Sequence, residues 1–154
     1  MSHADASAIL AADILPALRF SRQQTQLVCA AIAAHRYSAG VTPDSQEGML
    51  LQDADRLDAL GAIGIARTFC EGHHRALYHP TDPFPDGRPL DDARFTLDHF
   101  YSKLLILHKT LHTEQARFIA LRRREFMLSF LREIAGELGI LFESSSPWQA
   151  YDTL

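Results

Sequence analysis

Residues 50–69 read LLQDADRLDALGAIGIARTF, and this stretch decides how the 154-residue chain is interpreted. It places Asp53, Asp55, Arg56 and Asp58 within an otherwise apolar helical segment. Burying a carboxylate without a partner is costly, so the cluster must be solvated, paired or bound to a metal. At about 100° per residue, Asp55 and Asp58 lie together beside the apolar face, with Asp53 nearly opposite. The pattern allows a site for a hard cation, or a solvated turn in which Arg56 pairs a neighbouring Asp.

The composition is that of a globular chain and limits the classes of function. A hydrophobic content of 47% and a charged content of 22% fit one domain with a real core. The formal charge of −4 argues against a protein that coats nucleic acid or lies on a membrane surface. No apolar run approaches the roughly twenty residues of a membrane helix, and the start of the chain lacks the basic region of a signal peptide. We therefore expect a cytoplasmic protein, with Cys29 and Cys70 reduced and buried.

Hydrophobic periodicity predicts helices throughout. Ser21 and Gln24 have the spacing of a capping box, and Thr42 before Pro43 is typical of a helix start. The expected helices span about 4–18, 21–35, 42–71, 92–108 and 114–138. The third is expected to bend at Gly61 or Gly64, and a Pro-rich loop precedes the fourth. The last helix carries an apolar stripe of Phe118, Leu121, Phe126, Phe130 and Ile134, and Arg122, Arg123 and Arg124 are expected on a solvated face.

The string DADRLDALGAIGIARTF, residues 53–69, resembles the last metal-binding motif of the HD-domain phosphohydrolases, closest to a small bacterial branch. The resemblance continues in VCAAIAAHRYS, residues 28–38, and in DPFPDGRPLDDARFTLDHFYSKLL, residues 82–105. It covers roughly residues 7–138. It implies an all-α, HD-domain-like helical bundle that hydrolyses a phosphate ester or anhydride, with a nucleotide or another phosphorylated small molecule as substrate. A divalent cation, Mn²⁺ or Mg²⁺, is the expected cofactor.

The chain departs from the superfamily in its metal ligands. The family is named for a His and then an adjacent His-Asp pair, all on helices before the final Asp. This chain has no His-Asp dipeptide, and its first histidine is His3. The segment SHADASAILAADIL, residues 2–15, looks like the helix that follows the pair. The resemblance therefore implies an N-terminally truncated domain: residues 1–138 form its C-terminal part and residues 139–154 a mobile tail. With three of four ligands missing, we expect the isolated chain to be inactive or weak.

The resemblance assigns roles within the charged cluster. Asp55 matches the Asp of the A-D-R segment that closes the metal site, so it is expected to be a metal ligand and catalytic. Hard cations prefer such oxygen ligands. Asp58, one turn on, could orient a ligand or a water, or could pair Arg56 on the surface. Arg56 could bind a substrate phosphate or form a structural salt bridge.

Three further residues are candidates for contacts with substrate. His35 lies on the inward face of its expected helix and either lines the site or is a hydrogen-bonded core residue; Arg36 stands where the branch commonly has Ser. His99 and Lys103 are four apart, as in the family's H-F-Y-x-K-L string. Lys103 is expected to contact phosphate and to stabilise charge in catalysis, with His99 in the substrate site. The alternative is a stacked His99 beside a solvated Lys103.

Two other hypotheses remain open from the sequence. The chain could be one half of a split enzyme, with missing N-terminal helices supplied by another polypeptide, and would then be a homo-oligomer or poorly soluble alone because apolar surface is uncovered. It could also be a non-catalytic helical remnant that binds a partner. The histidines at 73, 74, 79, 108 and 112 have no obvious set of zinc ligands around them and are expected to be solvated or packed in loops.

Overall fold

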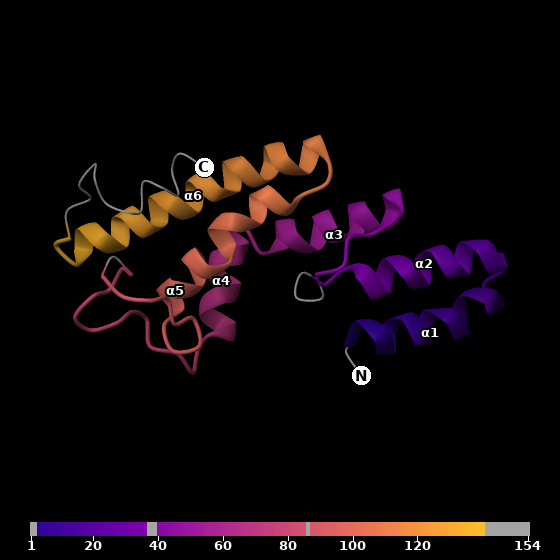
Figure 1. The fold of residues 1–154 in the computed structure, drawn as a ribbon, viewed down its shortest axis with the longest axis horizontal. Helices are drawn as coiled ribbons and strands as arrows, with labels where there is room; N and C mark the ends of the chain where they lie inside the picture. Colours follow the sequence, from indigo (N-terminus) through magenta and orange to yellow (C-terminus); the bar gives the residue numbers. More distant parts are fainter. Residues whose placement is uncertain (1–2, 37–39, 86, 141–154) are drawn as a thin grey trace. The chain divides into compact units, whose positions relative to one another are not determined.

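The computed structural model describes residues 3–36, 40–85 and 87–140. This part of the chain is helical and contains no strand; Ala76 and Phe95 form an isolated bridge. The helices in Figure 1 are α1 (His3–Ala17), α2 (Arg22–Ala34), α3 (Gln46–Asp58), α4 (Gly61–Glu71), α5 (Thr96–Ser102) and α6 (Glu114–Glu137), with a 3₁₀ helix, η2 (Leu104–Thr110), after α5. The predicted all-α fold is confirmed.

Contacts divide the described residues into two compact units. The first unit combines the described residues up to 57 with residues 111–117, and the second combines residues 58–110 with 118–140. Helix α6 begins in the first unit and ends in the second.

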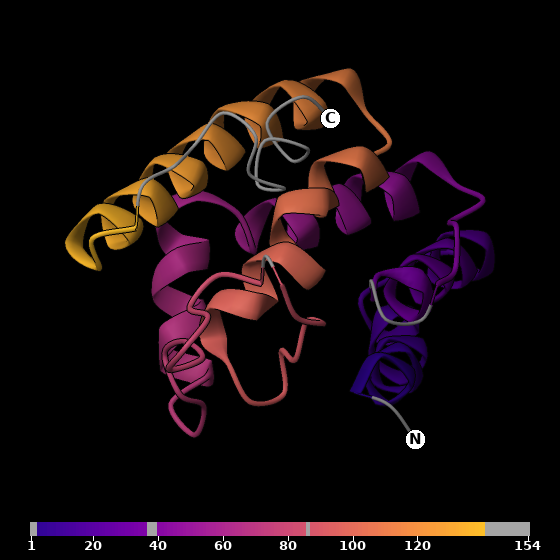
Figure 2. The same cartoon turned by 60° about the vertical axis from the view of Figure 1, so that its left-hand side comes forward.

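The first unit contains α1 and α2, which lie side by side in both ribbon views (Figures 1 and 2). The predicted capping box starts α2: Ser21 Oγ accepts a hydrogen bond from Gln24 N at 3.3 Å, and Gln24 Oε1 accepts one from Ser21 N at 2.9 Å. On α1, the side chains of Ile9, Leu10 and Ile14 are about half exposed, at 55%, 58% and 46%. The first unit therefore presents apolar surface along this helix.

The helix predicted over residues 42–71 is instead two helices, α3 and α4. The chain turns at Gly61, whose φ of 76° is one that L side chains rarely adopt, and a Cβ there would lie 3.0 Å from Arg123 Cγ. A Cβ on Gly64 would lie 2.2 Å from Ala59 O, so this turn also requires a glycine inside α4. The predicted start at Thr42 is wrong as well: Ser45 Oγ accepts from Gly48 N at 3.0 Å, and α3 begins at Gln46.

The second unit holds an apolar core between α5, η2 and the C-terminal part of α6. The helix predicted over residues 92–108 is divided, because α5 ends at Ser102 and the chain continues as η2. The ring centroids of Phe69 and Phe130 lie 5.9 Å apart in this unit. Its fully buried side chains include Leu97, Phe100, Leu105, Leu107, Met127 and Leu131.

Helix α6 ends one residue before the predicted limit, but a different face is buried. Phe118, Leu121 and Phe126 of the predicted stripe are largely exposed. A step of five residues between Leu121 and Phe126 breaks the helical period. The buried residues instead advance in steps of three or four: Ala116, Ala120, Arg124, Met127, Leu131 and Ala135. Arg124 is thus buried rather than solvated, and its Nε donates to Leu105 O at 3.2 Å.

Three smaller predictions concern the rest of the chain. The expectation of two buried cysteines is wrong for Cys70, which is exposed, while Cys29 is half-buried; both are free thiols. The predicted mobile tail, residues 139–154, lies outside the described residues from position 141 onward. Among the described helices, none is long and apolar enough to cross a membrane.

Candidate functional site

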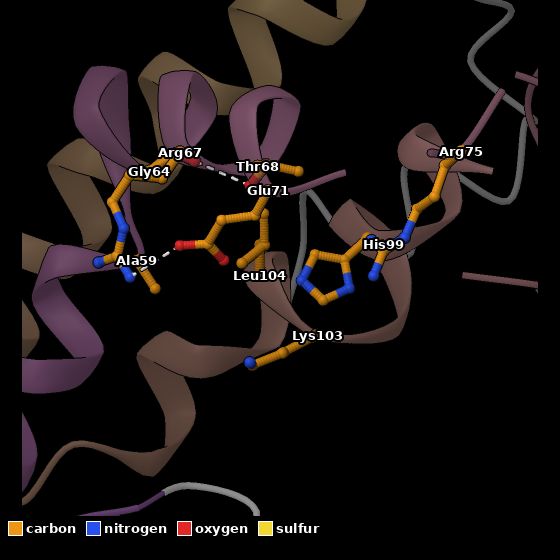
Figure 3. A pocket seen from close by; sticks show the side chains of 9 residues that line it. All are labelled: Ala59, Gly64, Arg67, Thr68, Glu71, Arg75, His99, Lys103 and Leu104. Carbon is orange, nitrogen blue, oxygen red and sulfur yellow. Dashed lines mark hydrogen bonds and ion pairs between the residues drawn. The ribbon is translucent and has the colours of Figure 1, made fainter. Parts of the chain in front are cut away.

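A cavity of about 270 Å³ in the second unit gathers charged side chains from three elements (Figure 3). Arg67 and Glu71 come from α4, Arg75 from the turn that follows it, and His99 and Lys103 from α5 and its end. Its floor and walls are completed by Ala59, Gly64, Thr68 and Leu104. The structure thus brings together His99 and Lys103, both predicted site residues, with cations that the sequence analysis did not single out.

The lining of this cavity carries three basic side chains and one carboxylate. Arg67, Arg75 and Lys103 oppose the single carboxylate of Glu71, which leaves two net positive charges on the lining when His99 is neutral. Arg67 is an ion-pair partner of Glu71 at 3.3 Å and of Asp58, and the hydrogen bond to Glu71 is the main cause that raises its pKa. The Nε atom of Arg75 is buried and has no hydrogen-bond partner among the described residues. Such an arrangement favours an anionic ligand.

The imidazole of His99 is oriented by the carboxylate of Asp92. Its Nδ1 lies 3.2 Å from Asp92 Oδ2, and Ser102 Oγ donates to the same oxygen at 2.7 Å. These two hydrogen bonds, Ser102 first, lower the pKa of Asp92, so the carboxylate is ionised and accepts. Nδ1 of His99 is therefore the protonated nitrogen of the neutral ring, and Nε2 is an acceptor. In Figure 3 the ring edge away from Arg75 faces the side where the Glu71 carboxylate lies.

The surroundings of His99 lower its pKa. Burial is the largest cause that lowers its pKa, and the positive charges of Lys103 and Arg75 lower it further. Asp92 opposes this effect but does not reverse it. An imidazole in this state can accept a proton at Nε2 under neutral conditions.

A buried ion pair fixes the start of α5, next to His99. Asp98 is fully buried, and Arg88 binds both of its oxygens, with Nη1–Oδ2 and Nη2–Oδ1 distances of 2.5 and 2.7 Å. The backbone N–H of Asp91 donates to Asp98 Oδ2 at 2.7 Å. This bidentate geometry ties the Pro-rich loop to the helix that carries His99.

In the charged cluster of α3, the inward carboxylate belongs to Asp53, contrary to the prediction that Asp55 and Asp58 lie beside the apolar face and Asp53 opposite it. Asp53 is 2% exposed and binds the start of α6 within the first unit. Its Oδ1 accepts from His112 N at 2.8 Å, and its Oδ2 accepts from Thr113 N and Oγ1 at 2.9 and 2.7 Å. Asp53 is therefore a helix-capping residue whose lone pairs are occupied by the fold.

The other predicted residues of this cluster lie apart from one another. Asp55 is exposed, and Asp58 pairs with Arg67 rather than with Arg56. Arg56 is buried in the first unit, with Nη1 3.3 Å from His112 Nε2. His35, also in the first unit, is half-buried with Nδ1 2.6 Å from Ile32 O.

Sequence comparison relates the chain to one curated bacterial protein. No family model matches it. The protein YpgQ of Bacillus subtilis (strain 168), described as uncharacterized, is 41% identical over 108 residues, which span 67% of this chain and 46% of YpgQ. The chain therefore covers less than half the length of this relative.

Solved structures give the fold relationship. The crystal structure of B. subtilis YpgQ in complex with ADP matches with a TM-score of 0.67 and 32% identity, over 84% of this chain and 61% of that one. A Bacillus thuringiensis HD-superfamily hydrolase matches with a TM-score of 0.64 and 38% identity over the same shares, 84% and 61%. A predicted HD superfamily hydrolase from an uncultured Thermotogales bacterium matches at 0.58 and 30%, over 90% and 56%. The chain belongs to the HD-domain superfamily.

The HD superfamily generally implies a divalent metal, and the described residues do not fit one. Within the described ranges, no group of three or more His, Cys, Asp or Glu side chains could hold a metal ion. Asp55, the ligand expected from the HD motif, is exposed, and one carboxylate does not hold a divalent cation tightly.

The HD resemblance pointed to His99 and Lys103 but missed the residues around them. Arg67 and Glu71 are four apart on one helix, a spacing visible in the sequence. Arg75 and Asp92 lie in turns and loops, and their place beside His99 depends on the fold of the Pro-rich segment. Local patterns carry no signal for such contacts.

Proposed function

We propose that this chain provides the phosphate-binding part of an HD-superfamily phosphohydrolase. One observation carries the proposal: Arg75 and Lys103 line one cavity beside Arg67, which is already paired with Glu71 and Asp58. Guanidinium groups bind phosphate oxygens through parallel N–H donors, and an ammonium adds a mobile point charge. A buried Arg75 Nε without a partner among the described residues supports an anion as the missing acceptor.

The size of the cavity supports the phosphate portion of a small molecule as its occupant. Pockets that enclose a whole drug-sized ligand run from about 300 to 1,000 Å³, and this one, at about 270 Å³, lies just below that range. YpgQ, the relative of known structure, was solved with ADP. A nucleoside diphosphate whose phosphates enter the cavity is therefore the first ligand to test.

Within this proposal, Arg75 and Lys103 contact the phosphate oxygens, and Lys103 neutralises charge on the departing oxygen. Arg67 already forms ion pairs with Asp58 and Glu71. It therefore contributes positive electrostatic potential to the cavity rather than hydrogen bonds to the phosphate. Metal-assisted hydrolysis with Mn²⁺ or Mg²⁺ would use Asp55 and would require further ligands. The roles of His35 and Arg56 as substrate contacts, and of Asp58 in orienting a ligand, stay predictions.

A second candidate function, binding a protein partner or another copy of the chain, is favoured by the apolar surface of α1. Ile9, Leu10 and Ile14 are each about half exposed on this helix. Exposed apolar side chains favour association when they lie together on one surface. The mass in solution, measured by light scattering after size exclusion, tests it: a stable monomer at high concentration would contradict this function.

Isothermal titration calorimetry with ADP and with inorganic phosphate tests the principal proposal. Substituting Lys103→Met should weaken ADP binding roughly 10-fold or more, because one charge-assisted hydrogen bond contributes about 1.5–3 kcal/mol. Lys109→Met is the matched control: Lys109 is exposed on η2 and does not line the cavity. If the unmodified chain binds neither ADP nor phosphate, or if both variants bind equally, the proposal is wrong.

A further inference from the structure

His99 presents a hydrogen-bond acceptor to the cavity. Its Nδ1 lies 3.2 Å from the Asp92 carboxylate, which places the proton of the neutral ring on that nitrogen. Nε2 therefore carries a lone pair, and it has no hydrogen-bond partner among the described residues. Ser102 Oγ donates to the same Asp92 oxygen at 2.7 Å, so a network outside the cavity lining fixes the tautomer of His99.

Cationic donors line the same cavity as this acceptor. Arg75 and Lys103 both belong to the lining, and the Nε atom of Arg75 is buried without a partner among the described residues. Figure 3 shows the Arg75 side chain ending beside one edge of the His99 ring, while Lys103 extends on the side away from Arg75. An anion bound by these cations therefore also meets the lone pair of Nε2.

An acceptor beside a bound anion determines which anions fit. Sulfate carries no proton at neutral pH, so its oxygens repel the lone pair of Nε2 and leave that acceptor desolvated without a partner. Hydrogen phosphate has the same shape and the same double negative charge, but its P–OH group can donate to Nε2. An unsatisfied acceptor in a binding site weakens binding of the ligand that lacks the donor.

We propose that His99 selects the ligand of this cavity by accepting a hydrogen bond from a P–OH group, so that a phosphate carrying a proton binds and sulfate is rejected. This inference rests on the proposed phosphate-binding function of the same cavity. His99 is a specificity-determining residue that contacts the ligand, and Asp92 is a positioning residue. Neither residue is assigned a step of hydrolysis, for which the superfamily generally implies a divalent metal.

Two kinds of ligand offer a P–OH group. Inorganic phosphate keeps one such group throughout the neutral and mildly alkaline range. The terminal phosphate of an ester or anhydride such as ADP loses its last proton with a pKa of about 6. Affinity for inorganic phosphate should therefore be nearly constant between pH 7 and 9, whereas affinity for ADP should fall over this range, by at most about 10-fold per pH unit.

The groups that face His99 keep its acceptor available above pH 7. Burial is the largest cause that lowers its pKa; Lys103 from the end of α5 and Arg75 from the turn after α4 lower it further, and Asp92 from the loop before α5 opposes them. Arg67 and Glu71 on α4 line the cavity as an ion pair. Below the pKa of His99, Nε2 becomes a donor, and the preference for phosphate over sulfate should decline.

Calorimetry with inorganic phosphate and with sulfate at pH 7.5 measures the selection. The unmodified chain should bind phosphate roughly 10-fold or more tightly than sulfate, the effect of one unsatisfied acceptor. His99→Gln should abolish most of this ratio, because an amide can turn its oxygen toward a P–OH or its NH₂ toward sulfate. His73→Gln, at an exposed histidine outside the cavity, is the matched control and should retain the ratio.

Asp92→Asn tests the positioning role. An asparagine can donate to Nδ1 as well as accept from it, so both tautomers of His99 become accessible and affinity for sulfate should rise. Long-range ¹H–¹⁵N spectra of the histidine side chains report the tautomer. His99 should be protonated at Nδ1 alone in the unmodified chain, with and without phosphate, and should be a mixture of tautomers in Asp92→Asn.

The outcomes separate this inference from the proposed function. If phosphate and sulfate bind equally, if His99→Gln retains the ratio, or if phosphate protonates Nε2 on binding, the cavity binds anions but selection by His99 is wrong. An unchanged tautomer in Asp92→Asn overturns the positioning role. Affinity for ADP that does not change with pH would assign the selection to inorganic phosphate alone. If the chain binds neither ADP nor phosphate, the proposed function itself fails.

Discussion

Two polar clusters, one in each compact unit, hold a histidine in different ways. In the first unit, Gln52 uses its amide nitrogen to donate to two backbone carbonyls, at 2.8 Å each, so its oxygen is the acceptor for His112 Nε2 at 2.6 Å. In the second unit, Asp92 occupies Nδ1 of His99 and leaves Nε2 toward a cavity. The hydrogen-bonding groups of Gln52 are engaged within the fold, whereas the cluster around His99 retains hydrogen-bonding capacity for a ligand.

This difference shows how to separate structural from functional polar residues in one chain. Gln52 is fully buried and Asp53 nearly so, and their polar atoms serve the fold. A closed network of this kind contributes stability and a unique arrangement. A site that must bind a ligand cannot use all its donors and acceptors internally. Burial of charge is therefore less informative than the direction in which unused donors and acceptors point.

The largest expected effect on stability comes from breaking the buried ion pair between Arg88 and Asp98 in the second unit. Arg88→Met should reduce the free energy of unfolding by about 3–5 kcal/mol, because Asp98 would remain buried without its partner. Arg94→Met is the matched control. Both guanidinium groups lie over the ring of Phe95, at 5.1 and 5.2 Å, but Arg94 is largely exposed. Urea unfolding measures both; equal losses would show that the contact with Phe95, rather than Asp98, is what matters.

A smaller effect is expected at the cap of α6. Asp53→Ala should cost about 2–4 kcal/mol of unfolding free energy, because two backbone N–H groups and one hydroxyl lose their acceptor. Asp55→Ala, two residues away on the exposed side, should change stability by no more than about 0.5 kcal/mol. Thermal and urea unfolding in the absence of metal distinguish the two. A larger loss for Asp55→Ala would mean that the assignment of these carboxylates is reversed.

Ligand affinity at the cavity that contains His99 should depend on the charge of its lining rather than on packing. Glu71→Gln removes the one carboxylate of the cavity lining and releases Arg67 from one of its two partners. We expect ADP to bind roughly two- to fivefold more tightly, in line with the small free energies of exposed ion pairs, with little change in stability. Calorimetry at two salt concentrations measures this, since the gain should shrink as ionic strength rises. Weaker binding would indicate that Glu71 itself contacts the ligand.

Local signals in the sequence were sufficient for part of the fold. The capping box at Ser21 and the bounds of α6 follow from interactions within a few residues, and the structure confirms both. The division of the predicted 42–71 helix depends on Gly61 and Gly64, where a Cβ would meet Arg123 and the carbonyl oxygen of Ala59 respectively. The sequence indicated a bend at these glycines but contained no signal strong enough to end a helix there.

The charged cluster of α3 shows why site geometry was harder to predict. Helical periodicity correctly separated Asp53 from Asp55 and Asp58, but it could not tell which side faces inward. Leu50 and Leu51 are 50% and 38% exposed, so hydrophobicity indicated the wrong side. The inward side was decided by hydrogen bonds to residues about sixty positions away, at the start of α6. Contacts of such separation leave no local pattern.

The smallest expected effect is the pH dependence of stability that His99 contributes in the second unit. The pKa of His99 in the folded chain lies below its ordinary value of 6.5, chiefly because of burial. Between those two values the unfolded chain binds more protons than the folded chain. The free energy of unfolding should therefore fall as pH is lowered from about 6.5 through the folded pKa, and this contribution is fully present above pH 6.5.

His99→Gln should remove this part of the slope, whereas His73→Gln, at an exposed position, should leave it in place. Urea unfolding between pH 5 and 8 measures the difference between the two variants. ADP should steepen the dependence if Nε2 must stay unprotonated in the complex. It should flatten or reverse the dependence if the phosphate instead binds protonated His99, because a bound anion favours the charged imidazole. That reversal would show that His99 binds the anion in its protonated form.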